Sequence, residues 1–234
     1  MNVFQNKDKD PIHEDHDDIN PTNHVRISRV FISGRPGSGK TNIVKNIIKE
    51  QYPPFNYIQV MVADEGTKEY DFAETITKVE DIMNYQLLPD HEKLCVIFED
   101  CEFASMSKKT LAVIDKLCRY GCTHKGVMCI IICQNFYSCP PGLRRKMDIF
   151  YITRADKQTQ ALISKVLPIT KKQFDYMCQM YLISKYDSLC IDLSHPRSMF
   201  RKNMFEDIKI EDIDRKIYDD DMNKLKAIVE MRKK

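Results

Sequence analysis

The chain has 234 residues, of which 43% are hydrophobic and 30% are charged, and its formal net charge is +2. This length suits one domain with a single core and at most a small appendage, and it is too short for two full domains. No apolar run approaches the roughly 18 residues that a membrane-spanning helix needs, so we expect no transmembrane segment.

The nine cysteines indicate whether the chain contains disulfides or reduced thiols. None of them forms a C-x-x-C pair. Several, including Cys95 and Cys129, fall in expected strands, where a free thiol behaves as a small apolar group. We therefore expect reduced thiols and a cytosolic compartment. Zinc binding by Cys118, Cys122 and His124 is disfavoured, because their spacing fits no common zinc site.

Residues 1–24 are expected to form a flexible acidic arm. They contain six acidic residues and two lysines, together with two prolines, and show no apolar periodicity. Such composition is typical of segments that do not fold alone. The remaining residues, 25–234, carry the balance of the charge, +6, which permits contact with DNA without demonstrating it.

After the arm, the sequence predicts a buried strand, a loop and a helix in direct succession. The apolar residues Val30–Ile32 precede the loop, and residues 42–50 carry apolar side chains at helical spacing. Between them, Gly34–Thr41 fills every fixed position of the phosphate-binding loop, G-x-x-x-x-G-K-[ST]. The expected nucleotide-binding residues are Gly34, Arg35, Pro36, Gly37, Ser38, Gly39, Lys40, Thr41 and Asn42.

This loop predicts how a nucleoside triphosphate would be bound. Its glycines allow backbone N–H groups to converge on phosphate oxygens, and the helix dipole adds partial positive charge at the same point. Lys40 is expected to reach the β- and γ-phosphates, and the Thr41 hydroxyl is expected to bind Mg²⁺.

Hydrophobic periodicity predicts alternating strands and helices further along the chain. We expect strands at 57–62, 94–98, 127–133, 149–152 and 188–193, and helices at 67–85, 107–120, 156–166 and 171–183. Beyond Pro196 the chain is expected to be helical to its end. This pattern predicts an α/β fold with a mainly parallel sheet and helices on both faces. We divide the chain into the arm (1–24), a P-loop domain (25–195) and a charged C-terminal helical extension (196–234).

Polar side chains follow two of the expected strands where those strands end. Ligands bind at the carboxyl ends of strands in such sheets, and Glu99-Asp100 and Gln134 both fall there. Hydrolysis requires a carboxylate near the metal and a group that orients water. We expect Glu99 on the metal side and Asp100 on the water side. Gln134 is either a sensor of the γ-phosphate or a strand-end cap.

A basic cluster follows at Arg144, Arg145 and Lys146. This cluster is either a solvated turn or the source of an arginine that stabilises the transition state in a neighbouring subunit.

The order of these motifs resembles the genome-packaging ATPases of large double-stranded DNA viruses and virophages, a branch of the FtsK–HerA superfamily. The resemblance covers about residues 27–155. Gly34–Thr41 matches the Walker A loop, and Leu94–Asp100 matches the Walker B strand. His124, ten residues before Gln134, is similar to the histidine that precedes the family's glutamine, and Pro140–Arg144 is similar to the family's arginine segment.

The chain departs from the family pattern at three positions. Glu99 stands where the family usually has aspartate, so the division of roles between Glu99 and Asp100 is open. Thr123 replaces the arginine before the histidine. Lys146 replaces a common asparagine, which leaves the choice between Arg144 and Arg145 open.

The resemblance implies a RecA/FtsK–HerA-like P-loop fold and an ATP-driven motor that moves double-stranded DNA into a capsid. It implies ATP and Mg²⁺ as cofactors, with Thr41 and Glu99 as metal ligands. The implied catalytic residues are Lys40, Glu99, Asp100, Gln134 and Arg144.

A trans-acting arginine further implies a ring of identical subunits, a pentamer or hexamer, with a capsid or portal-vertex protein as partner. Such a motor would work at the viral assembly site in the host-cell cytoplasm, in the virion, or in both. Lys108, Lys109 and the tail 232–234 are candidate DNA contacts.

Two other functions remain open. A P-loop kinase for nucleotides or polynucleotide ends would use Arg154, Lys171 and Lys172 as a lid, but it would leave Gln134 without a role. A virion protein that binds ATP without hydrolysing it is favoured only by the Glu99-Asp100 order. A GTPase is disfavoured, because the chain has no [NT]-K-x-D motif.

Overall fold

The computed structural model describes residues 28–51, 53–62, 68–154, 156–163, 165, 167, 169–195 and 199–232. The expected acidic arm, residues 1–24, lies outside the described residues, as do the last two residues of the candidate DNA-binding tail.

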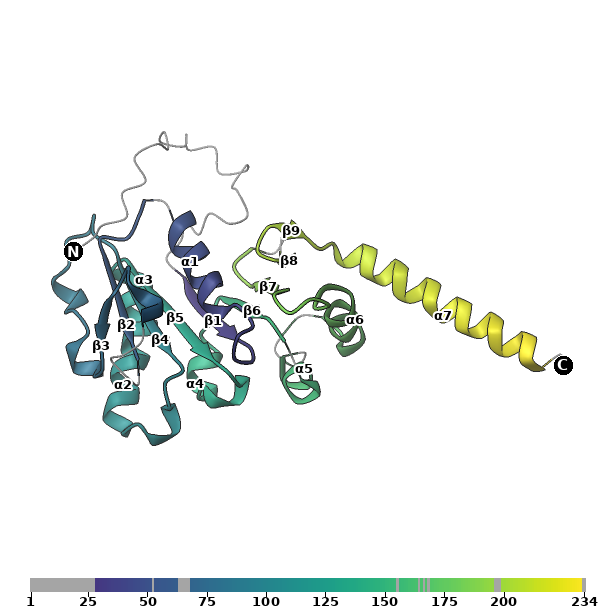
Figure 1. Ribbon diagram of the computed structural model, residues 1–234, viewed down its shortest axis with the longest axis horizontal. Coiled ribbons are helices and arrows are strands. Elements are labelled where there is room, and N and C mark those ends of the chain that lie inside the picture. The colour runs from purple at the N-terminus through teal and green to yellow at the C-terminus, as the bar shows by residue number, and fades with distance from the viewer. Residues whose placement is uncertain are drawn as a thin grey trace.

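A nine-stranded sheet runs through the molecule in the order β3-β2-β4-β5-β1-β6-β7-β8-β9 (Figure 1). The first six strands along this order pair in parallel, and the last three are antiparallel. The strands are β1 (Arg29–Ser33), β2 (Tyr57–Met61), β3 (Glu74–Ile76), β4 (Leu94–Glu99), β5 (Val127–Cys133), β6 (Ile149–Ile152), β7 (Leu189–Asp192), β8 (Phe200–Lys202) and β9 (Glu206–Asp207).

The central strands are buried on both faces, and alternate residues serve two separate cores. In β5, Cys129 and Ile131 pack into one core, whereas Ile130 and Ile132 pack into the other. Because successive strand side chains point to opposite faces, a continuous apolar run is what a sheet covered on both sides requires.

Helices cover both faces of this sheet. Helix α1 (Lys40–Glu50) packs Val44 and Ile47 into one core. Helices α2 (Lys108–Lys116) and α6 (Lys171–Tyr181) pack Ile114 and Phe174 into the other. The shorter helices are α3 (Cys122–His124), α4 (Pro141–Arg144) and α5 (Lys157–Ile163), and a π-helical segment, Leu117–Gly121, joins α2 to α3.

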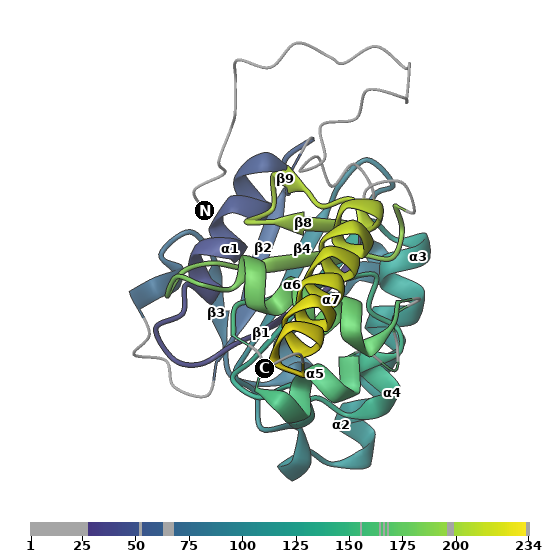
Figure 2. The same cartoon turned by 90° about the vertical axis from the view of Figure 1, so that its right-hand side faces the viewer.

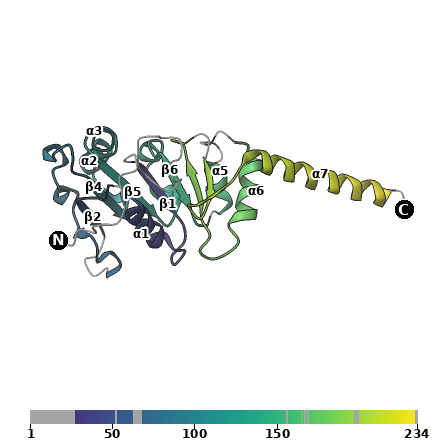
Figure 3. The ribbon, with the colours of Figure 1, turned by 90° about the horizontal axis from the view of Figure 1, so that it is seen from above.

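The last helix, α7 (Ile210–Arg232), projects away from the sheet (Figures 1 and 3). Its first turns pack beside α6 (Figure 2), where the Gln173 amide donates a hydrogen bond of 2.7 Å to Asp214. Ile213 is fully buried at that junction, whereas Leu225 and Met231 further along are exposed. None of the helices in the described ranges is long and apolar enough to cross a membrane.

The expected α/β fold is confirmed, and so are most of the expected elements. The helix expected at 67–85 is wrong. That stretch instead forms short 3₁₀ turns at Lys68–Tyr70, Val79–Asp81 and Tyr85–Leu87, with β3 between the first two. Ile76 and Val79 do enter the core, but Thr75, Ile76 and Thr77 are β-branched and favour a strand. The exposed edge of β2 supplies the partner, with Met61 opposite Ile76.

The expectation of continuous helix beyond Pro196 is wrong at 200–207. Strands β8 and β9 form there and extend the sheet. Phe200 and Arg201 are both buried against β7. The strand was not predicted because the segment is charged and so looked exposed. Arg201 is in fact buried, and it forms an ion pair with Asp192.

Candidate nucleotide site

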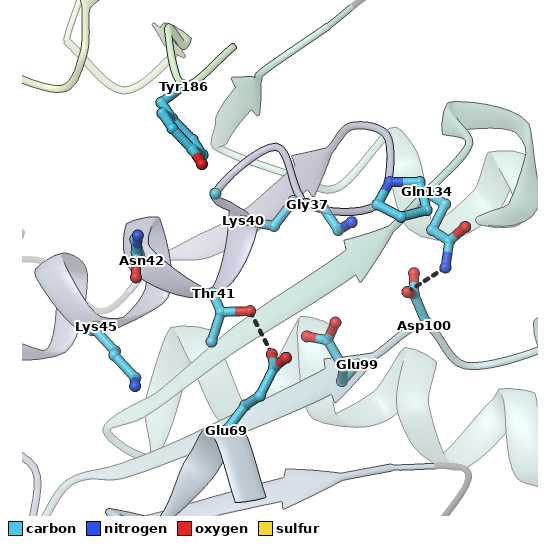
Figure 4. Close-up of a pocket in the computed structure, with 12 residues that line it drawn as sticks. Gly37, Lys40, Thr41, Asn42, Lys45, Glu69, Glu99, Asp100, Gln134 and Tyr186 are labelled. Carbon is cyan, nitrogen blue, oxygen red and sulfur yellow. Dashed lines mark hydrogen bonds between the residues drawn. The ribbon is translucent and has the colours of Figure 1, made fainter. Parts of the chain in front are cut away.

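A pocket of about 440 Å³ opens at the carboxyl ends of the central parallel strands (Figure 4). It brings together segments that are far apart in the sequence. It is lined by Pro36, Gly37, Gly39, Lys40, Thr41, Asn42, Lys45, Glu69, Glu99, Asp100, Gln134 and Tyr186. Three separate polar segments that the sequence placed at strand ends therefore meet in one pocket.

The loop Gly34–Gly39 is shaped by backbone conformations and close packing. Gly37 and Gly39 have φ angles of 68° and 91°, in the left-handed region that glycine tolerates best. A Cβ atom at Gly34 would lie 1.7 Å from the Thr153 hydroxyl oxygen. That hydroxyl donates a hydrogen bond of 2.6 Å to Ser38. Thr153, which follows β6, thus braces the loop from below.

Lys40 is buried at the base of the loop. Its side chain is 7% exposed, and its ammonium group donates hydrogen bonds of 3.0 Å and 3.4 Å to the carbonyls of Gly34 and Arg35. Lys40 lies at the N-terminus of α1, where an anion can bind. The ammonium group can then donate its hydrogen bonds to the anion in place of the two carbonyls. Among the other loop residues expected to bind nucleotide, Gly34 and Ser38 are buried against Thr153, whereas Arg35 is exposed.

An acidic group lies opposite Thr41. The Thr41 hydroxyl donates a hydrogen bond of 3.0 Å to Glu69 (Figure 4). Glu99 lies beside them and accepts a hydrogen bond from the Tyr70 hydroxyl. Burial raises the pKa of the Glu99 carboxyl, and the charges of Asp100 and Glu69 raise it further, whereas Tyr70 and Lys40 lower it. The site therefore concentrates negative charge that a cation would neutralise.

Asp100 faces a different neighbour. It adopts a φ of 44°, which is uncommon for a residue other than glycine. In this conformation its carboxylate accepts a hydrogen bond of 2.8 Å from the Gln134 side-chain amide. Strained backbone of this kind clusters at functional sites. The two adjacent acids thus point to different partners, Glu99 toward Thr41 and Asp100 toward Gln134 (Figure 4).

The residues present fit Mg²⁺ bound together with a nucleotide. Within the described ranges, no group of three or more His, Cys, Asp or Glu side chains is arranged to hold a metal ion alone. Mg²⁺ commonly binds through one or two carboxylates together with substrate phosphates. Thr41 and Glu99, which both line the phosphate pocket, supply a hydroxyl and a carboxylate for such a site.

Arg144 does not line the pocket that contains the P-loop. It lines a second pocket, of about 430 Å³, with Phe136, Pro141, Arg145, Phe150, Leu162 and Lys165. Its guanidinium lies 5.0 Å from the centre of the Phe136 ring and 5.8 Å from that of Tyr137, and it donates to the Phe136 carbonyl at 3.3 Å. Arg145 is more exposed than Arg144. The loop that follows β5 therefore carries Gln134 into one pocket and Arg144 into another.

Two other predicted groups lie apart from the phosphate pocket. His124 precedes β5, so it lies at the opposite end of that strand from Gln134, and its ring packs 5.1 Å from that of Tyr120. Lys108 and Lys109 are exposed at the start of α2.

All nine cysteines are free and buried. Cys118 lies with its sulfur 3.3 Å from that of Cys129.

Several residues that shape the site could not be predicted from the sequence. Glu69 and Tyr70 were hidden inside the helix wrongly expected at 67–85. Tyr186 lies in a short loop before β7, and Phe136 and Tyr137 lie before the arginine segment. Phe136 and Tyr137 precede Arg144 by eight and seven residues, and this spacing is visible in the sequence. The sequence does not show that both rings face the guanidinium.

The comparisons with known proteins agree with this geometry. The model of the ATPase family associated with various cellular activities (AAA) matches residues 30–154, more than half of the chain. No curated protein is similar enough in sequence to match.

Among solved structures, the chain resembles B204, the DNA-packaging ATPase from Sulfolobus turreted icosahedral virus. The TM-score is 0.57 at 16% identity, covering 79% of this chain and all of B204. The B204 packaging NTPase of Sulfolobus turreted icosahedral virus 2, in complex with ATP-gammaS, matches with a TM-score of 0.55 at 18% identity, covering 79% of this chain and 97% of that one. The pCW3 conjugation coupling protein TcpA matches with a TM-score of 0.51 at 12% identity, covering 81% of this chain and 63% of TcpA.

At these identities the structural matches establish the fold, and they confirm the expected likeness to the fold of viral genome-packaging ATPases. The family match covers the P-loop, both acids, Gln134 and Arg144. This chain belongs to the ATPase family associated with various cellular activities (AAA).

Proposed function

We propose that this chain is an ATP-driven motor that moves double-stranded DNA into a viral capsid. One observation carries the proposal. The P-loop, Glu99, Asp100 and Gln134 converge on one pocket, while Arg144, ten residues after Gln134, faces a different pocket. An ATPase centre that holds every group except its arginine is typical of enzymes whose arginine comes from a neighbouring subunit.

Within one subunit, each group would have a separate role in ATP hydrolysis. Lys40 and the loop N–H groups would hold the β- and γ-phosphates. Thr41 and Glu99 would hold Mg²⁺, which supplies positive charge to the phosphate oxygens. Asp100 and Gln134, already hydrogen-bonded to each other, would orient the attacking water. Glu69, beside Thr41, adds negative charge that favours a cation at this point.

Arg144 would complete the site of the adjacent subunit. Its position between two aromatic rings and a carbonyl restricts the guanidinium before any partner arrives. A preorganised cation that is aimed at developing negative charge lowers the reaction barrier most. Such an exchange requires head-to-tail contacts, which close into a ring of five or six identical subunits.

DNA would pass through this ring, contacted by exposed cations such as Lys108 and Lys109 at the start of α2. The likeness in fold to a DNA-packaging ATPase and to a conjugation coupling protein supports this role. We propose a capsid or portal-vertex protein as the docking partner, and the viral assembly site in the host-cell cytoplasm or the virion as the place of action. The acidic arm, the P-loop domain with its edge strands β8 and β9, and the charged helix α7 would be its three parts.

Steady-state ATP hydrolysis with and without long double-stranded DNA tests the proposal. We expect DNA to raise turnover several-fold, and we expect this stimulation to fall as salt increases, because phosphate contacts release counterions. Turnover that is indifferent to DNA would favour the kinase alternative. Lys172, one of the lid residues of that alternative, forms an exposed ion pair with Asp221 on α7. Absence of turnover with and without DNA would favour the non-hydrolysing alternative.

Mixing variants tests the trans-acting arginine. A Lys40→Ala subunit cannot hydrolyse ATP but still presents Arg144, whereas an Arg144→Ala subunit has an intact pocket. We expect each variant alone to be inactive and the mixture to regain part of the activity. Repeating the mixture with Arg145→Ala in place of Arg144→Ala decides between the two arginines. Failure of every mixture to recover activity would contradict a shared site.

A further inference from the structure

A tyrosine with no part in the proposed hydrolysis lines the phosphate pocket. Tyr186 lies in the loop between α6 and β7, and it is 65% exposed. In Figure 4 its ring lies across the P-loop from Glu99 and Asp100. Because Tyr186 is exposed and lines the pocket, its ring is available to a ligand bound there.

The Tyr186 loop closely approaches the glycines of the P-loop. A Cβ atom at Gly39 would lie 3.5 Å from Cδ1 of Tyr186, and one at Gly37 would lie 3.9 Å from the Lys185 ammonium. Lys185 also lies over the tyrosine ring, 5.2 Å from its centre. The loop therefore places an aromatic face and a positive charge beside the phosphate-binding glycines.

Hydrogen bonds fix this loop in place. The Asp187 carboxylate accepts hydrogen bonds from the backbone N–H groups of Ile183, at 3.1 Å, and Ser184, at 2.7 Å. Asn203, which follows β8, accepts a hydrogen bond of 2.8 Å from the Ser188 N–H and donates one of 3.4 Å to Asp187. The antiparallel edge of the sheet thus holds Tyr186 against a loop that belongs to the parallel part.

The orientation of a bound triphosphate follows from the groups already described. Lys40, Thr41 and Glu99 mark the positions of the β- and γ-phosphates. The nucleoside must then lie at the other end of the triphosphate, past the start of α1 and away from Asp100. Tyr186 lies on that side of the P-loop, and both Tyr186 and Asn42 line the pocket (Figure 4).

We propose that Tyr186 stacks on the base of the bound nucleotide, with Lys185 beside the sugar and phosphates. This assignment rests on the nucleotide binding proposed above. Stacking engages the flat face that every base presents, so it gives affinity without base selectivity. We therefore expect Tyr186→Ala to weaken the binding of ATP and GTP alike, by about tenfold.

Calorimetric titration of the full-length chain with Mg²⁺-ATP, Mg²⁺-GTP and Mg²⁺-tripolyphosphate separates base contacts from phosphate contacts. Tyr186→Ala should lose nucleotide affinity and keep its affinity for tripolyphosphate, and Tyr186→Phe should bind all three like the unmodified chain. Tyr218→Ala is the matched control, because Tyr218 is similarly exposed, at 63%, on α7. Lys40→Ala should lose all three ligands.

The absence of tryptophan from the sequence offers a second readout. Tyr186→Trp creates a single fluorescent reporter at the proposed contact, and Tyr218→Trp creates one away from it. We expect ATP to quench the first reporter and not the second, and tripolyphosphate to quench neither.

The outcomes separate the two proposals. If the unmodified chain binds neither ATP nor tripolyphosphate, the proposed function fails and this assignment fails with it. If the unmodified chain and Tyr186→Ala bind ATP equally, or if Tyr186→Ala loses tripolyphosphate to the same extent, the stacking role is overturned while the phosphate site stands. Equal quenching of the Tyr186→Trp reporter by tripolyphosphate would also overturn it.

Discussion

The two parts of the sheet differ in what they supply. The parallel part, from β3 to β6, has buried apolar runs in its central strands, and the segments that follow β1, β4 and β5 carry the P-loop, both acids and Gln134. The antiparallel edge, β7 to β9, is shorter and more polar. It buries the Arg201–Asp192 ion pair, positions Tyr186 and leads into α7. In our proposals the chemistry lies in the parallel part, and the contact with the nucleoside lies at the antiparallel edge.

The ion pair at the antiparallel edge should be the most sensitive point for stability. Arg201 is 1% exposed, and its guanidinium lies 3.1 Å from Asp192 and 3.3 Å from the Cys190 sulfur. Arg201→Ala leaves a buried carboxylate unpaired, so we expect a loss of about 3–5 kcal/mol in the free energy of unfolding, measured by urea denaturation.

The control for this variant is Lys172→Ala, which breaks the exposed pair with Asp221. It should cost at most about 1 kcal/mol. Similar losses in the two variants would show that the antiparallel edge does not depend on its buried pair.

Lys40→Ala should separate activity from stability in the parallel part. Removal of a preorganised cation from phosphate oxygens is expected to lower turnover by about 10²–10³-fold. The unfolding midpoint should change little, because Lys40 hydrogen-bonds only to loop carbonyls in the described structure. Lys49→Ala, at an exposed position of the same helix, should retain full turnover. A large loss of stability in Lys40→Ala would instead indicate a structural role.

Gly34→Ala should test how tightly β6 braces the P-loop. The new methyl group would overlap the Thr153 hydroxyl, so either the loop or β6 must shift. Overpacking of this kind costs about 1–3 kcal/mol. Gly142→Ala is the matched control, since a Cβ there meets nothing within 4 Å. A neutral Gly34→Ala in thermal unfolding would contradict the close packing described here.

Glu99→Gln should have the smallest effect on stability, and the effect should be favourable. Because burial raises the pKa of Glu99 above its ordinary value of 4.5, folding takes up a proton between the unfolded and folded pKa values. Stability therefore falls as pH rises through that interval, and the charged carboxylate remains a cost above it.

In metal-free buffer near neutral pH, we expect Glu99→Gln to raise stability by about 1 kcal/mol, or about 2–4 °C in Tm. The gain should vanish at low pH, and turnover should be lost throughout. A destabilised Glu99→Gln variant at neutral pH would contradict the assignment of Glu99 as a partly buried charge held for function.

The sequence predicted the parallel part well because its signals are local. Val127–Cys133 is apolar throughout, and the P-loop fixes its own position between a strand and a helix. The groups around it escaped prediction because they depend on tertiary contacts. Glu69 reaches Thr41 from a 3₁₀ turn between β2 and β3, two strands that pair with each other. Arg201 looks like a surface charge until Asp192 is brought opposite it, and Tyr186 is unremarkable until its loop folds over Gly39.

Displacement of a third strand from a DNA triplex measures movement along the duplex directly. The assay uses the full chain, a long double-stranded DNA that carries one triplex, and Mg²⁺-ATP. We predict that the unmodified chain displaces the third strand at a rate that falls with distance between the triplex and the free DNA end, and that Lys40→Ala and Arg144→Ala displace none. ATP hydrolysis that DNA stimulates without any displacement would contradict a motor that moves along DNA.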